Sequence, residues 1–232
     1  MPTPDGYLTE DEAIALGDSR AGMGFYRTTR VFLRLFLLRP YRVEVEGRDR
    51  LDLAGPVVVA PVHRSNFDAP ILGAISIRRM RYLAKRSLFK GRALSWVMSA
   101  LGGFPVDREN ADRGALASAQ RLLEQGDAVL VFPEGTRQSG DVVPELFEGA
   151  VFLASRTNAP IVPVGIHGSE GALPPGKRLP RLTRIRVVVG EPIHLEAEGG
   201  RMRRSARQQA TADLRVELQR LYDAARRPAS RS

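Results

Sequence analysis

The sequence contains no cysteine, only three histidines and no uninterrupted apolar run long enough to cross a bilayer. The absence of cysteine excludes disulfides, thiolate metal sites and cysteine nucleophiles. Three histidines are too few to favour a multi-histidine metal centre, so neither a metal nor a bound cofactor is expected. A membrane-spanning helix requires about 20 apolar residues, and the sequence predicts no such helix.

The 232 residues are 43% hydrophobic and include 35 basic and 26 acidic side chains, which gives a net charge of +9. This length and composition predict one globular domain with its own core. The positive balance favours an anionic partner, which could be a nucleic acid, a phospholipid surface or a phosphorylated small molecule. Composition alone leaves these three open, together with a surface charge that serves solubility only.

The charge is unevenly distributed near the N-terminus. Residues 1–22 contain five acidic residues and one arginine without an apolar period, which predicts an acidic flexible tail or a short surface helix. Residues 23–40 predict an amphipathic helix that lies on a membrane, with arginines at the headgroups and apolar side chains in the acyl boundary. The residues expected to contact the membrane are Phe25, Arg27, Arg30, Phe32, Arg34, Leu35 and Phe36. The alternative is an ordinary helix whose apolar face packs on the core.

Over residues 41–232, short valine-rich segments alternate with helical patterns. This alternation predicts an α/β fold, a single domain with a mostly parallel or mixed sheet covered by helices. A basic C-terminal helix with one leucine stripe is expected over residues 204–226. Ligands of such sheets bind beyond the strand ends, so we expect the site at the strand exits near His63, Asp107 and Pro133.

The first strand exit places a histidine five residues before an aspartate. Across a turn into a helix, the Asp68 carboxylate can accept a hydrogen bond from one imidazole nitrogen of His63. The other nitrogen is then free to take a proton from a substrate hydroxyl. This is the orienting half of a catalytic triad, with the nucleophile supplied by the substrate. Taken alone, the spacing more often marks a structural aspartate that caps a helix.

The second and third strand exits each place an arginine beside glycines. Residues 102–108 read GGFPVDR, and residues 132–140 read FPEGTRQSG. Arginine binds phosphate oxygens bidentately, and glycine lets backbone N–H groups approach an anion closely. Arg108 and Arg137 are therefore candidate phosphate ligands, although each also fits a solvated charge in a surface turn.

In this order and spacing, the motifs resemble the glycerolipid acyltransferase family. His63 and Asp68 match the family's HX4D motif, and the second motif matches residues 103–108. The sequence FPEGTR over residues 132–137 matches the third motif letter for letter, and IVPV over residues 161–164 matches the fourth.

Two positions depart from the family pattern. Val62 stands where members often have asparagine, and Ser87 stands where an acidic residue is common. These departures affect details of acceptor binding rather than the class of reaction, because the base, its orienting carboxylate and the phosphate ligands are all present.

The resemblance implies transfer of a fatty acyl group from acyl-CoA or acyl carrier protein to the free hydroxyl of 1-acylglycerol 3-phosphate, which yields phosphatidic acid for phospholipid biosynthesis. It implies that His63 is the general base, oriented by Asp68. The implied acceptor site consists of Arg108 and Arg137, which would bind the phosphate, and of Glu134, Gly135 and Thr136, which would shape the loop. The chain has no cysteine and no Gly-x-Ser-x-Gly elbow, which favours direct attack in a ternary complex over an acyl-enzyme.

The expected partners are an anionic phospholipid membrane surface, acyl-CoA and lysophosphatidic acid or a similar acceptor. The expected place is the cytoplasmic face of the cell membrane, as a peripheral or monotopic protein, and no nucleic acid partner is expected. One alternative is the same chemistry on glycerol 3-phosphate or another lysolipid. A basic nucleic-acid-binding protein is a weaker alternative, because no recognised binding motif is visible. A histidine phosphoesterase is a further alternative. It would need metal ligands or a second catalytic histidine, and the sequence offers neither close to His63.

Overall fold

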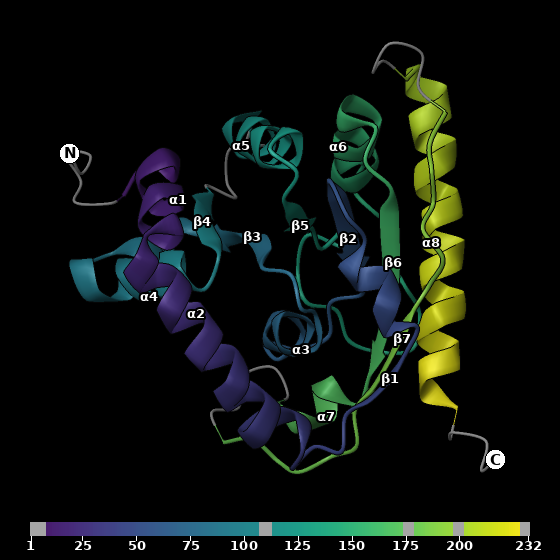
Figure 1. Ribbon diagram of the computed structural model, residues 1–232. Helices are drawn as coiled ribbons and strands as arrows, with labels where there is room; N and C mark the ends of the chain where they lie inside the picture. The colour runs from purple at the N-terminus through teal and green to yellow at the C-terminus, as the bar shows by residue number, and fades with distance from the viewer. Residues whose placement is uncertain (1–7, 107–112, 174–178, 197–201, 228–232) are drawn as a thin grey trace.

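Seven strands form one sheet in the computed structural model, which describes residues 8–106, 113–173, 179–196 and 202–227 (Figure 1). The strands are β1 (Glu44–Glu46), β2 (Val57–Pro61), β3 (Met80–Lys85), β4 (Gly103–Val106), β5 (Ala128–Leu130), β6 (Ile161–His167) and β7 (Arg186–Val189). The helices are α1 (Glu10–Asp18), α2 (Arg20–Leu33), α3 (Asp68–Ile75), α4 (Arg92–Ala100), α5 (Arg113–Glu124), α6 (Gly149–Thr157), α7 (Ser169–Ala172) and α8 (Arg204–Arg226). Three further helical segments of the described chain are the π-helix η1 (Arg34–Leu38) and the 3-10 helices η2 (Arg48–Asp52) and η3 (Arg86–Phe89).

The sheet has the strand order β1-β7-β6-β2-β5-β3-β4. Strands β6, β2, β5, β3 and β4 pair in parallel, whereas β7 runs antiparallel to β6 and β1 follows β7 in parallel. The predicted fold is therefore confirmed as a single α/β unit with a mostly parallel mixed sheet covered by helices and a long C-terminal helix.

Helices cover both faces of the sheet because the chain reverses its direction of travel across it. From β2 the chain crosses through α3 to β3, and it returns through α5 to β5 and through α6 to β6. Right-handed crossovers that run in opposite directions place their helices on opposite faces. In Figure 1, α5 and α6 accordingly lie on the other side of the sheet from α3.

Buried apolar strands form the centre of the core. Every residue of β2 is buried, as expected for a central parallel strand with helices on both faces. Helix α8 packs along β6, and the predicted leucine stripe at Leu214, Leu218 and Leu221 is buried. Gly165 permits this close approach, since a Cβ there would lie 2.3 Å from the backbone of Leu221.

Of the flexible tail and the short helix expected for residues 1–22, the structure shows helix from residue 10 onwards. Residues 10–18 form α1, which begins with a capping box between Thr9 and Glu12 and packs against α4. Asp18 at its end forms ion pairs with Arg79 at 2.8 Å and Arg81 at 2.6 Å. The acidic residues of this segment therefore stabilise a helix start and join the helix to the sheet.

The amphipathic segment that follows is helical, as predicted. It consists of α2 and the continuing π-helix η1, and α2 packs against both α3 and α4. Among the described residues, no helix has both the length and the apolar composition needed to cross a membrane.

Candidate active site

The predicted histidine and aspartate meet at the carboxyl edge of the sheet. Strand β2 ends at Pro61, and α3 begins at Asp68, so the intervening turn carries His63. The Nδ1 atom of His63 lies 3.0 Å from Oδ2 of Asp68. The Asp68 side chain is fully buried, and 13% of the His63 side chain is exposed. With Nδ1–H donating to the carboxylate, the Nε2 atom is left to accept a proton.

The Asp68 carboxylate receives more donors than the sequence predicts. Its Oδ2 atom accepts the backbone N–H groups of Arg64 and Ser65, each at 2.7 Å. Its Oδ1 atom accepts the hydroxyl of Ser169 at 2.7 Å. Hydrogen bonds to a carboxylate favour its ionised form, which burial opposes. These donors therefore explain how a fully buried carboxylate is accommodated beside His63.

The His63 ring is also held by an aromatic neighbour. It stacks on Phe132, which follows β5, with the ring centroids 3.7 Å apart and the planes at 21°. The backbone carbonyl of His63 accepts the N–H of Gln138 at 2.8 Å. Strands β2 and β5 are neighbours in the sheet, so the segment after β5 contacts the turn after β2 and holds it in place.

Glu134 lies beneath the turn and not on the described wall of the cavity. Its Oε1 atom accepts the backbone N–H of His63 at 3.2 Å, and its Oε2 atom lies 3.3 Å from Nη1 of Arg64. Both side chains of this ion pair are buried, and the Arg64 guanidinium lies 4.8 Å from the centre of the Tyr222 ring on α8. Burial raises the pKa of Glu134 to about 7, although the charge of Arg64 acts in the opposite direction. Glu134 thus contacts the turn that carries His63, and its expected role in shaping the acceptor loop stays a prediction.

An apolar cavity of about 700 Å³ lies beside His63. Its wall is formed by α2, α3, β3 and the end of α4, together with the turns after β2 and β5. The larger apolar and aromatic side chains of this wall are Tyr26, Leu33, Pro70, Met80, Tyr82, Leu83, Leu88, Met98, Leu101, Leu130 and Phe132.

Basic and polar side chains line the same cavity. Thr136 and Arg137 belong to the loop after β5, and Lys85 lies at the end of β3. Gly135 precedes them with φ +70°, and a Cβ at this position would lie 2.7 Å from the Phe147 ring. Glycine therefore permits the tight turn that carries Thr136 and Arg137. Arg108, the other predicted phosphate ligand, lies outside the described residues.

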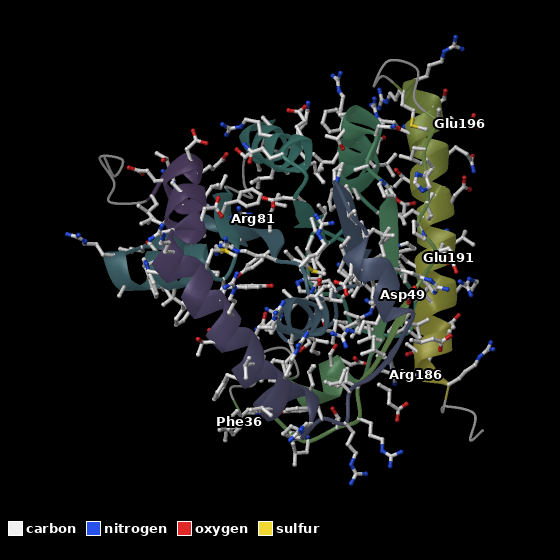
Figure 2. All side chains as sticks on the ribbon, viewed as in Figure 1. Phe36, Asp49, Arg81, Arg186, Glu191 and Glu196 are labelled. Carbon is white, nitrogen blue, oxygen red and sulfur yellow. The ribbon has the colours of Figure 1, made fainter. Side chains whose placement is uncertain are left out.

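Three of the predicted membrane-contacting residues are exposed apolar side chains. The exposed fractions are 55% for Phe32, 42% for Leu35 and 61% for Phe36. The Phe32 and Phe36 rings stack with their centroids 4.5 Å apart. Figure 2 places Phe36 at the far end of this helical segment, directed away from the sheet. Arg27 is also exposed.

Other residues of the predicted membrane face contact the protein itself. Arg34 Nε donates to the carbonyl of Ala74 at 2.7 Å, and Arg30 donates to the carbonyls of Ser76 and Ile77. These guanidinium groups satisfy carbonyls at and just after the end of α3, where a helix lacks internal partners and carries negative partial charge. The ring of Phe25 packs against Trp96 of α4 at 5.0 Å. Arg30 and Arg34 therefore form hydrogen bonds within the fold, and their contact with headgroups stays a prediction.

The described residues offer no cluster of three histidine, aspartate or glutamate side chains that could hold a metal ion.

Comparison with known proteins identifies the family. Residues 42–167 match the family model described as Acyltransferase. The chain belongs to the Acyltransferase family. In this acyltransferase-family chain, the matched segment includes the turn after β2, which carries His63, and the loop after β5, which carries Arg137.

Curated relatives and a solved structure agree with this assignment. The chain is 33% identical over 153 residues to the 1-acyl-sn-glycerol-3-phosphate acyltransferase of Bacillus subtilis, covering 66% of this chain and 74% of the relative. It is 27% identical over 158 residues to the chloroplastic 1-acyl-sn-glycerol-3-phosphate acyltransferase LPAT1 of Arabidopsis thaliana, but spans only 44% of that relative's length. The crystal structure of the 1-acyl-sn-glycerophosphate (LPA) acyltransferase PlsC from Thermotoga maritima has the same fold, with a TM-score of 0.71, 22% identity and coverage of 88% of this chain and 81% of that one.

Proposed function

We propose that this chain is a 1-acylglycerol-3-phosphate acyltransferase. It transfers a fatty acyl group from acyl-CoA or acyl carrier protein to the free hydroxyl of lysophosphatidic acid and forms phosphatidic acid. The names of the relatives support this activity. The observation that carries the proposal is the hydrogen-bonded His63–Asp68 pair beside a largely apolar cavity that is also lined by Arg137 and Lys85. An acyl chain fits the apolar wall, and a phosphate fits the basic side chains.

In the proposed reaction, His63 acts as a general base and then as a general acid. Its Nε2 atom takes the proton of the acceptor hydroxyl as the oxygen attacks the thioester carbonyl carbon. The tetrahedral intermediate collapses, the C–S bond breaks, and the leaving sulfur takes the proton from the imidazolium. Asp68, 3.0 Å from Nδ1, fixes the tautomer of His63 and stabilises the positive ring. No covalent intermediate with the protein is formed.

The acceptor phosphate is assigned to the loop after β5. Arg137 binds the phosphate oxygens, with the Thr136 hydroxyl and the Lys85 ammonium lining the same space. Arg108 is proposed for the same role on the sequence motif alone. Gly135 shapes the loop, and Glu134 acts indirectly, since it holds the backbone N–H of His63 and the Arg64 guanidinium.

We also propose that the α2–η1 apolar patch, defined as Val31, Phe32, Leu35 and Phe36, contacts an anionic phospholipid surface at the cytoplasmic face of the membrane. These large apolar side chains are exposed on one short stretch of helix, with the exposed Arg27 and Arg39 nearby in the sequence. Apolar side chains that enter the acyl boundary beside cationic groups are typical of interfacial helices. Leu33 of the same helix lines the cavity, so a lipid acceptor could pass from the bilayer to His63 along α2.

An assay of the purified chain with one labelled acyl-CoA tests the proposed activity. The acceptors are 1-acyl and 2-acyl lysophosphatidate and glycerol 3-phosphate, each added with phospholipid vesicles, and acyl carrier protein is tried as the second donor. We expect phosphatidic acid from 1-acyl lysophosphatidate. Product only from glycerol 3-phosphate would replace the acceptor while keeping the chemistry. Inactivity with every acceptor and both donors would contradict the proposed function.

A further inference from the structure

Ser169 reaches the catalytic turn from the neighbouring strand. Strand β6 pairs in parallel with β2, so both strands end at the same edge of the sheet. Ser169 follows β6 and donates its hydroxyl to Oδ1 of Asp68 at 2.7 Å. Both residues are fully buried. The other carboxylate oxygen, Oδ2, is occupied by His63 and by two backbone N–H groups.

The backbone around Ser169 is fixed independently of Asp68. Gly168 has φ +89°, and a Cβ there would lie 2.1 Å from the carbonyl oxygen of Arg184. The Gly168 carbonyl accepts the Thr183 hydroxyl at 2.9 Å. A second contact joins this segment to the turn, because the Ser65 hydroxyl lies 3.4 Å from the carbonyl oxygen of Leu173. These contacts fix the backbone at Ser169 independently of the hydrogen bond that its hydroxyl donates to Asp68.

We propose that Ser169 is a positioning residue that holds the Asp68 carboxylate in the orientation in which its Oδ2 atom faces Nδ1 of His63. This inference rests on the proposed acyl transfer by His63. A buried acceptor that loses its donor is left unsatisfied, so without Ser169 the Asp68 carboxylate is no longer fixed with Oδ2 towards His63. A carboxylate turned away from Nδ1 stabilises less well the imidazolium that forms during the transfer. Ser169 is not among the residues that line the cavity, so its effect reaches the substrate only through Asp68.

Kinetics of Ser169→Ala test the proposal. We expect kcat to fall at least about tenfold, which is the lower end of the effect of a hydrogen bond to a charged group. KM for thioester and acceptor should stay unchanged, and the acid limb of the pH–rate profile should move to lower pH, because an imidazolium that is less well stabilised loses its proton more readily. Ser169→Thr keeps the hydroxyl and should retain most of the activity.

The matched control is Ser155→Ala, which removes another buried hydroxyl that donates to the carbonyl of Phe152 on α6 at 2.9 Å. It should leave kcat and the pH profile unchanged. An unchanged pH profile in Ser169→Ala, or an equal loss of activity in Ser155→Ala, would overturn the proposal.

A spectroscopic measurement separates this proposal from the proposed function. The chain has only three histidines, so the Nδ1 proton resonance of His63 can be assigned by its loss in His63→Gln. In Ser169→Ala without substrate, this resonance should move upfield of its wild-type position, because the hydrogen bond from Nδ1 to Asp68 is weakened. If the wild type transfers no acyl group, the proposed function fails while this readout still tests Ser169.

An unchanged resonance would overturn the role of Ser169. If Ser169→Ala does not fold, Ser169→Cys has a similar size and a weaker donor and is given the same measurements, with the same expected directions.

Discussion

The turn that carries His63 and the helical segment formed by α2 and η1 lie on different sides of the cavity, and they differ in how far their side chains are exposed. On the sheet side, the turn with His63 rests on buried polar contacts, with Asp68 and Glu134 each accepting a backbone N–H group from it. On the α2 side, Phe32 and Phe36 leave more than half of their side chains exposed. This contrast separates two requirements, since a proton transfer needs a fixed geometry, whereas contact with a lipid surface needs accessible apolar area.

The largest expected effect is on the sheet side. His63→Ala should lower kcat by about 10²- to 10⁴-fold, because general-base catalysis contributes about that factor. The exposed His194 provides the matched control, and His194→Ala should be as active as the wild type. Transfer at the wild-type rate by a folded His63→Ala protein would show that His63 is not the general base. The fixed geometry of the sheet side would then have no role in proton transfer.

Arg137→Ala should change acceptor binding more than turnover. We expect KM for lysophosphatidate to rise by about 10- to 100-fold, because a hydrogen bond from arginine to a charged phosphate contributes about 1.5 to 3 kcal/mol. KM for acyl-CoA should change much less. Arg215→Ala removes an exposed arginine from α8 and serves as the control. Equal KM values for the acceptor in the two variants would show that Arg137 does not bind the phosphate.

On the α2 side, the double variant Phe32→Ser/Phe36→Ser should weaken binding to anionic vesicles by about tenfold or more, because burial of a phenylalanine side chain contributes about 1.5 to 3 kcal/mol. Activity on a dispersed short-chain acceptor should persist, since neither residue lines the cavity. Val216 on α8 is 64% exposed, and Val216→Ser should bind vesicles like the wild type. Co-sedimentation in which both variants lose the same affinity would contradict a specific role for the patch.

A smaller effect concerns the stability of the sheet side. Burial raises the pKa of Glu134 from its ordinary value of 4.5 to about 7. The folded protein therefore binds this proton more tightly than the unfolded chain, so the associated stability is present below pH 4.5 and is lost as the pH rises to 7. The loss is at most about 3.5 kcal/mol, because each pH unit between the two values contributes at most about 1.4 kcal/mol.

Glu134→Gln should remove this slope, which denaturant unfolding between pH 4.5 and pH 8 can measure. Identical slopes for the wild type and the variant would show that the Glu134 carboxyl stays ionised throughout that range.

The sequence predicted those features that depend on neighbours along the chain. The strands are visible as short apolar runs, and the spacing of His63 and Asp68 is enough to bring them together across one turn. The sequence also contains the Thr9–Glu12 capping box that begins α1. The acidic composition of residues 1–22 nevertheless left a flexible tail and a short surface helix both open. Helical projection placed Arg30 and Arg34 on one side of a helix and could not reveal that the end of α3 lies against that side.

Contacts between distant segments were not predictable from one sequence. Ser169 lies 101 positions from Asp68, and a single serine carries no pattern that would distinguish it from others. Glu134 stands in a motif beside Arg137, yet it is directed under the turn while Arg137 faces the cavity. Which way each of these side chains points depends on the packing of β5 against β2, and the motif letters do not record it.

The most direct test of direct acyl transfer is the simultaneous measurement of CoA release and phosphatidic acid formation by the wild-type chain, with and without lysophosphatidate. We expect equal rates of both products when the acceptor is present. Without acceptor, CoA should be released neither in a burst nor above the spontaneous rate of thioester hydrolysis. A burst of CoA equal to the enzyme concentration in the absence of acceptor would reveal an acyl-enzyme, and it would contradict direct attack by a hydroxyl activated by His63.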